Sequence, residues 1–129
     1  MKIETIREQG QRPVTIFRIT GSISAENYEE LEAHGQAAVQ AGTQDLLLDL
    51  SAVDFVSSSG LRAFHHLYML LHADAEAEEV RRDMRTGSYE APHLKLLNPN
   101  PHTINMLRMT GFDMVLGVYS DRGNAINAF

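Results

Sequence analysis

Three consecutive serines, Ser57, Ser58 and Ser59, precede a glycine and an amphipathic segment. In that segment apolar residues recur at spacings of three and four, the period of one helix face: Leu61, Phe64, Leu67 or Tyr68, and Leu71. A serine hydroxyl ahead of such a segment is a helix N-cap signal, because it can accept a hydrogen bond from the free amides of the first turn. We therefore expect the serines at the start of a helix.

A serine in that position can also accept a phosphoryl group. The unpaired N–H groups and the positive dipole end of a helix stabilise a phosphate. The modification adds roughly −1.5 to −2 charges, so it should leave its own helix folded and act on whatever binds to that surface. These residue types alone leave open which serine is modified, and whether all three serve only as helix caps.

The elements that must position the serines are predicted from the flanking residues. Leu46–Leu50 is a short apolar run bounded by polar residues, which suits a buried strand. A loop with Val53, Phe55 and Val56 as apolar anchors then leads to the serines. The stretch 46–71 is thus predicted to form a strand, a tight loop and a helix.

The rest of the chain alternates in type. Two strands, over 2–8 and 13–20, are predicted to form a hairpin with the first at a sheet edge. Ser24 is expected to cap a helix that ends near Gly42. Further along, the patterns predict a strand over 94–97, a helix from Pro101 to the capping Gly111, a strand over 115–119 and a short helix capped by Asp121. Such alternation predicts an α/β protein with a mixed, largely parallel sheet.

The stretch around the serines resembles the signature of the STAS domain, the fold of bacterial anti-sigma factor antagonists. Asp49-Leu50-Ser51 matches the first part of that signature, Val53 and Phe55 match its apolar anchors, and Ser58-Ser59-Gly60-Leu61 matches its last part. The resemblance implies one STAS domain over 1–129. It implies a small mixed β-sheet of about five strands, with about four helices mainly on one face. It covers most of the chain except a stretch near 74–92.

The same resemblance implies a phospho-switch that is not an enzyme. Unphosphorylated, the protein would bind an anti-sigma factor that is also a serine protein kinase, and so free a sigma factor for transcription. Phosphorylation at Ser58 would break the complex, and a PP2C-type phosphatase would reset it. Ser59 is the alternative acceptor, and the expected partner-binding residues are Ser24, Ser57, Ser59, Gly60 and Arg62. Ser57 and Ser24 stand where the family usually carries Asp, which implies a less acidic docking surface.

Residues 72–85 are rich in charge and poor in apolar side chains, and are predicted to extend the helix beyond the core. With the loop that follows they form an insertion of about 74–92. Because such segments seldom pack, we expect a solvated extension; the alternative is a partner-selection or dimerisation element. An alternative function is a STAS scaffold subunit of a signalling complex or a transporter-associated assembly, in which Ser58 is never phosphorylated.

Composition and charge exclude several classes of protein. The net charge of −6 argues against nonspecific nucleic-acid binding, and the absence of cysteine excludes disulfides and thiolate metal sites. The first ten residues carry charges where a signal peptide needs an apolar core, and no apolar run approaches the ~20 residues of a transmembrane helix. We expect a cytoplasmic bacterial protein without membrane attachment, as a monomer or weak dimer.

The residues fit neither a serine-hydrolase site nor a zinc site on a helix. A hydrolase elbow, Gly-x-Ser-x-Gly, would need glycine where Val56 stands. His65 and His72 share a helix face but lie two turns apart, too far for the i,i+4 pair of zinc-binding helices. We expect His65, His66 and His72 to be surface or half-buried residues. We predict no catalytic residue, no metal and no cofactor.

Overall fold

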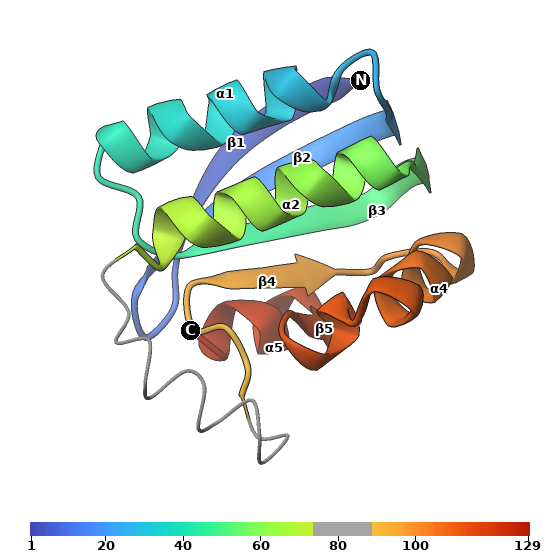
Figure 1. Ribbon diagram of the computed structural model, residues 1–129. Helices are drawn as coiled ribbons and strands as arrows, with labels where there is room; N and C mark the ends of the chain where they lie inside the picture. The colour runs from blue at the N-terminus through green and yellow to red at the C-terminus, as the bar shows by residue number, and fades with distance from the viewer. Residues whose placement is uncertain (74–88) are drawn as a thin grey trace.

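Five strands form one mixed sheet in the order in which they occur in the chain (Figure 1). The computed structural model describes residues 1–73 and 89–129. Its elements are β1 (Lys2–Gln9), β2 (Pro13–Ile23), α1 (Tyr28–Gln40), β3 (Leu46–Val56), α2 (Ser58–Leu71), β4 (Leu94–Leu97), α4 (Pro101–Thr110), the 3₁₀ helix η1 (Phe112–Met114), β5 (Gly117–Tyr119) and α5 (Arg122–Asn127). β1 pairs antiparallel with β2, and the other three pairs are parallel. The predicted hairpin and the edge position of β1 are confirmed.

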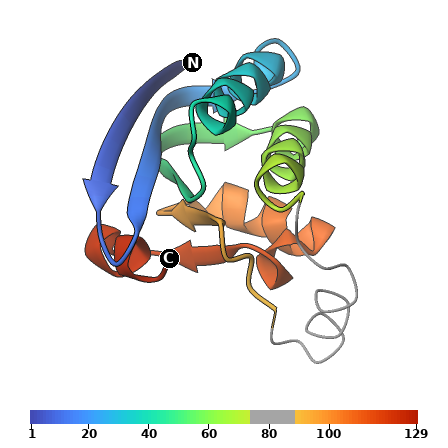
Figure 2. The same ribbon diagram turned by 90° about the vertical axis from the view of Figure 1, so that its left-hand side faces the viewer.

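Helices cover both faces of the sheet, but unequally (Figure 2). α1, α2 and α4 lie on one face and α5 lies on the other. The larger core, beneath the first three helices, takes Phe17 and Ile19 from β2. The smaller core, beneath α5, takes Val14 and Ile16 from the same strand. The apolar residues on both faces of β2 therefore reflect a strand that is buried on both sides, and the predicted mixed sheet with helices mainly on one face is confirmed.

The contact between α1 and α2 is unusually close at Gly35. This residue is buried on α1, and a Cβ atom built there would lie 1.9 Å from Cδ2 of Leu67 on α2. Only glycine leaves room for the leucine side chain, so Gly35 sets the spacing of the two helices over the sheet.

The loop predicted over 51–56 is wrong, because β3 continues as a strand to Val56. β2 is also longer than predicted and ends at Ile23, which pairs with Val56. The register between the two strands shifts twice, between Arg18 and Thr20 and between Gly21 and Ser22, and each time β3 carries one residue more than β2. Such bulges break the alternation of apolar and polar residues along β3, so the stretch 51–56 lacks the regular pattern of a strand.

The C-terminal third follows the prediction with one shortened strand. Gly111, with a φ of +80°, ends α4, and the Asp121 carboxylate accepts a hydrogen bond from the Asn124 amide at 2.8 Å to cap α5. β5 begins at Gly117 and not at Val115. The Val115 amide instead donates to the Phe112 carbonyl at 3.0 Å, which closes the 3₁₀ turn before the strand.

Most of the predicted insertion, residues 74–88, lies outside the described residues. Its last four residues correct the expectation of a wholly solvated segment, since Tyr89 and Ala91 are buried in the larger core. The Tyr89 hydroxyl pairs with the Tyr68 hydroxyl of α2 at 2.8 Å.

Within the described parts of the chain, no helix has both the length and the apolar character needed to cross a membrane.

Candidate functional site

The serine cluster lies at the edge of the sheet where parallel strands end. The carboxyl ends of β2, β3 and β4 point to the same side, and α1, α2 and α4 begin there (Figure 1). In open α/β sheets this edge gathers loops and helix N-termini from separate parts of the chain. The fold therefore brings the residues around 24, 57 and 100 to one surface.

The three serines occupy distinct positions at the start of α2. Ser57 is the N-cap, with an extended backbone, and its hydroxyl oxygen accepts a hydrogen bond from the Gly60 amide at 3.2 Å. Ser58 is the first residue of the helix and is exposed, whereas Ser59 is half-buried. Among the described residues, no hydrogen bond engages the Ser58 hydroxyl. Ser58 is thus the serine whose hydroxyl is both accessible and uncommitted.

The start of α2 is held against the sheet by backbone contacts. The Ser57 amide donates to the Ile23 carbonyl at 2.9 Å, which ties the cap to the end of β2. Gly60 is buried, and a Cβ atom there would lie 2.7 Å from Cγ1 of Val56 and 3.0 Å from the Ile23 carbonyl oxygen. Gly60 therefore serves the tight packing of α2 on the sheet, and its role in partner binding stays a prediction.

Ser24 does not cap a helix in the way expected, because α1 begins at Tyr28 after a turn. The Ser24 hydroxyl accepts from the Glu26 amide at 3.3 Å, and the Ser24 amide donates to the Asn27 side-chain oxygen at 2.9 Å. Asn27 also donates to the Ser22 carbonyl at 2.9 Å. This reciprocal arrangement resembles a capping box, with Asn in place of Glu or Gln. It orders the turn next to the Ser57 cap but begins the regular helix later than predicted.

Arg62 lies one turn beyond Ser58 on α2 and is exposed. Its guanidinium carbon lies 6.0 Å from the centre of the Tyr28 ring on α1, within the range of a cation–π contact. In the described part of the chain Arg62 forms no ion pair. Apart from this ring contact, its positive charge is available to a partner one turn from Ser58.

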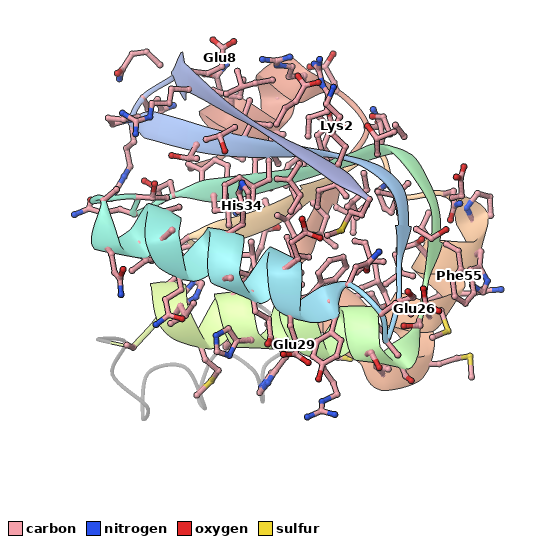
Figure 3. All side chains as sticks on the ribbon, turned by 90° about the horizontal axis from the view of Figure 1, so that it is seen from above. Lys2, Glu8, Glu26, Glu29, His34 and Phe55 are labelled. Atoms are coloured by element: carbon pink, nitrogen blue, oxygen red, sulfur yellow. The ribbon has the colours of Figure 1, made fainter. Side chains whose placement is uncertain are left out.

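Two aromatic side chains beside the serines were not predicted as site residues. Phe55 is 42% exposed at the end of β3, and its ring stacks on the His102 ring of α4 with centroids 4.9 Å apart. Asn100 caps α4 and also donates to the Asp54 carbonyl at 2.9 Å, which fixes the helix to β3. Figure 3 shows Phe55 and Glu26 at the same end of the molecule. The sequence offers one signal for Phe55, an apolar residue that directly follows a charged one near the end of a strand. Its contact with His102 cannot be predicted from sequence, because it depends on how the two segments lie in the fold.

The Asp49-Leu50-Ser51 segment supports the site from within the sheet. One Asp49 oxygen accepts from the Ser51 hydroxyl at 2.6 Å and from the Ser51 amide at 3.1 Å. The other faces the Arg18 guanidinium of β2 at 3.5 Å. Asn98, after β4, donates to the Ser51 hydroxyl at 3.2 Å. These contacts join β2, β3 and the end of β4.

A second polar cluster lies at the other edge of the sheet, where α2 ends and where β3 and β4 begin. His72 is buried, its Nδ1 pairs with the Tyr68 carbonyl at 2.8 Å, and its Nε2 accepts from the His93 amide at 3.1 Å. Since a carbonyl only accepts, the proton is on Nδ1. Burial lowers the pKa of His72, and the neighbouring His93 adds to this, against the opposing effect of the Tyr68 carbonyl. The expectation of a surface or half-buried His72 is wrong.

The same cluster extends to a buried carboxylate. Both oxygens of Asp45 are paired, one with His93 Nδ1 at 2.8 Å and the other with Arg12 Nε at 2.8 Å. His65 lies apart from it and stacks on Phe112. Over residues 1–73 and 89–129, no group of three histidine, aspartate or glutamate side chains is arranged to hold a metal ion.

Lys95 is a buried cation on the α5 side of the sheet. Its ammonium contacts the Glu90 carboxylate and donates to the Ala91 carbonyl at 3.2 Å. The Tyr119 hydroxyl donates to the same carboxylate at 2.7 Å. Burial opposes the ionisation of Glu90, but the hydrogen bonds from Lys95 and Tyr119 outweigh it and lower the Glu90 pKa. Burial and the Glu90 charge raise the pKa of Tyr119 to about 12.

Several known proteins are similar to this chain in sequence, in fold or in both. The STAS domain family model matches residues 5–75. The candidate anti-sigma factor antagonist BtrV of Bordetella bronchiseptica is 31% identical over 111 residues, which cover 86% of this chain and 82% of BtrV. The crystal structure of an anti-sigma factor antagonist from Mycobacterium paratuberculosis is 23% identical, with a TM-score of 0.69 over 98% of this chain and 93% of that one.

A third relative was solved in a modified form. The structure of the Bacillus cell fate determinant SpoIIAA in the phosphorylated form is 18% identical, with a TM-score of 0.63 over 96% of this chain and 97% of that one. At this identity the likeness concerns the fold alone. Together with the match of the family model over more than half of the sequence, the comparisons show that the chain belongs to the STAS domain family.

Proposed function

We propose that this protein is an anti-sigma factor antagonist that is switched by phosphorylation of Ser58. In this proposal the unphosphorylated protein binds a serine-kinase anti-sigma factor and thereby releases a sigma factor. The observation that carries it is the division of roles among the three serines. Ser57 caps the helix, Ser59 is half-buried, and Ser58 is exposed with its hydroxyl uncommitted among the described residues.

The position of Ser58 suits a modification that changes binding without changing the fold. A phosphate on the first residue of α2 would lie at the positive end of the helix dipole, beside free amides of the first turn. No acidic residue stands in that turn to repel it. The added charge, roughly −1.5 to −2, would instead meet the docked partner and weaken the complex.

The two departures from the family pattern are compatible with this role. Ser57 and Ser24 stand where the family usually carries Asp, and both serine hydroxyls accept backbone hydrogen bonds that an Asp carboxylate could also accept. The substitutions keep the local geometry and remove two negative charges. We infer that the partner of this protein has a less basic contact surface than a kinase whose substrate carries Asp at both positions.

The partner surface would extend beyond the serines. Phe55 with His102 offers an exposed aromatic pair beside Ser58, and Arg62 offers a positive charge one turn along the helix. Aromatic and arginine side chains carry a large share of binding energy in protein interfaces. Relatives named as anti-sigma factor antagonists support this assignment of partner class.

The test measures binding of the serine-kinase anti-sigma factor from the same organism, with purified proteins. Wild type and Ser58→Ala should bind it, and Ser58→Asp should bind at least about tenfold more weakly, since a charge buried at an interface costs more than ~1.4 kcal/mol. With ATP, the kinase should modify wild type and not Ser58→Ala. Equal binding by all three proteins, together with no phosphate transfer, would favour a scaffold role without phosphorylation and reject the switch.

A further inference from the structure

A partly open cavity of about 250 Å³ lies between α2 and the segment that joins α4 to β5. Its walls are mainly hydrocarbon. Phe64 and Tyr68 contribute from α2, and Phe112, Val115 and Leu116 contribute from the opposite side. Phe64 is fully buried, so the cavity reaches down to the larger core.

Most polar atoms around the cavity are already engaged within the protein. The Thr110 hydroxyl lies 3.0 Å from the Met106 carbonyl and 3.1 Å from the Leu107 carbonyl, and donates to them. The Tyr68 hydroxyl pairs with that of Tyr89 at 2.8 Å. Of the lining side chains, the His65 imidazole alone has no hydrogen bond within the described residues. A buried water needs two to four polar partners, so this lining suits an apolar occupant better than water.

The size and the walls indicate the class of occupant. An apolar protein cavity of about 150 Å³ holds a benzene molecule, so one of this size has room for two fused rings. The His65 and Phe112 rings, which both line the cavity, lie 9° from parallel with centroids 6.1 Å apart. Aromatic walls favour an aromatic guest through offset or edge contacts.

We propose that this cavity binds a small neutral aromatic molecule of about two fused rings, whose single polar group faces the His65 imidazole. The site is separate from the Ser58 surface, although both include α2. The proposal therefore does not depend on the phosphorylation of Ser58, and each can fail without the other.

The test titrates the full-length protein with indole, followed by NMR. Indole should shift the amide signals of residues around the cavity in a saturable way, and should show contacts between its ring protons and the Val115 methyl groups. Indene, which has the same shape but no N–H group, should bind several-fold more weakly because the hydrogen bond to His65 is lost. His65→Phe should remove the difference between the two probes.

Val115→Phe should fill the cavity and weaken indole binding by about tenfold or more. Val118→Phe is the matched control, since Val118 is 43% exposed on β5 and does not line the cavity, and it should bind as wild type does. Absence of saturable binding to wild type would overturn the proposal, as would ring contacts to residues elsewhere. The measurement on wild type decides this even if Val115→Phe does not fold.

Discussion

The Ser57 hydroxyl oxygen accepts a hydrogen bond from the Gly60 amide at 3.2 Å. This contact assigns the capping function of the cluster to its first serine and leaves the hydroxyl of the next one exposed. Aspartate is an equally good N-cap, so either residue type could start the helix at this position. Serine at position 57 starts the helix without the negative charge that an aspartate would add.

Removing the Ser57 cap should destabilise the protein, and removing the exposed Ser58 hydroxyl should not. We expect Ser57→Ala to lower the free energy of unfolding by about 1 kcal/mol, because the Gly60 amide loses its partner. Ser57→Asp should restore the cap, and Ser58→Ala should stay within about 0.5 kcal/mol of wild type as an exposed substitution. Urea denaturation compares the four proteins. A larger effect from Ser58→Ala than from Ser57→Ala would contradict the assignment of roles.

Gly60→Ala should be destabilising although alanine favours helices by about 1 kcal/mol over glycine. The added methyl would lie 2.7 Å from Val56 Cγ1 and 3.0 Å from the Ile23 carbonyl oxygen. We expect a net loss of about 1–3 kcal/mol in the free energy of unfolding, the usual range for overpacking. Gly123→Ala in α5, where the methyl would meet only a side-chain oxygen at 3.3 Å, is the control and should be neutral or stabilising. If both variants gain stability, the close approach at Gly60 is wrong.

His72 should make the protein less stable as the pH falls below about 6.5, the usual pKa of an unfolded histidine. Burial lowers its pKa in the folded state, so in that range the unfolded chain binds a proton that the folded chain excludes. The stability contributed by neutral His72 is complete above pH 6.5 and declines below it, by at most about 1.4 kcal/mol per pH unit for one proton.

The pH effect is measured by urea denaturation at several pH values between 7.5 and 5. His72→Gln should flatten the pH dependence and lower the stability at neutral pH, because the Tyr68 and His93 contacts are altered. His66→Gln, on the same helix, should keep the wild-type dependence because His72 is still present. Parallel profiles for wild type and His72→Gln would show that another group is responsible.

Glu90→Gln should leave the buried Lys95 ammonium without its counter-charge. Loss of one partner of a fully buried ion pair costs about 3–5 kcal/mol, but Glu90 is 45% exposed, so we expect about 1–3 kcal/mol after screening by water. The double variant Glu90→Gln/Lys95→Met should recover part of this loss, because it removes the unpaired charge. A double variant less stable than Glu90→Gln would contradict the expectation.

Tyr119 provides a spectroscopic readout of the same carboxylate. Its pKa is raised to about 12 by burial and by Glu90, so the stability it contributes is complete below about pH 10 and is lost as the pH rises toward 12. The difference in tyrosinate absorbance between wild type and Tyr119→Phe isolates its titration. In Glu90→Gln the midpoint should fall toward the usual value of about 10. An unchanged midpoint would show that Glu90 has no part in the shift.

The sequence predicted the elements well where a pattern was regular and uninterrupted. The helix after Ser57, the hairpin and the caps at Gly111 and Asp121 were all predicted from local signals, and the structure has them. The end of β3 is not predicted, because two bulges on this strand change its pairing with β2. A register shift is a property of two segments together and leaves little trace in either one alone.

Residues of the site that belong to distant segments could not be predicted in the same way. Phe55 was recognised as an apolar anchor, but its exposure and its stacking on His102 depend on where α4 begins above the sheet. His72 is predicted to be a surface or half-buried residue at the start of a helical extension, yet the structure buries it and the His93 amide donates to its ring. In both cases the missing information was a contact between residues far apart in the sequence.

The most direct test of the switch is phosphopeptide mapping of the protein purified from the cells in which it occurs, with and without stress. The account predicts phosphate on Ser58, in a proportion that changes with conditions, and none on Ser57, whose hydroxyl is engaged as the helix cap. Phosphate on Ser59 in place of Ser58 would contradict the proposal that Ser58 is the acceptor, which rests on the exposure of its side chain. No phosphate on any of the three serines under all conditions would contradict the switch itself.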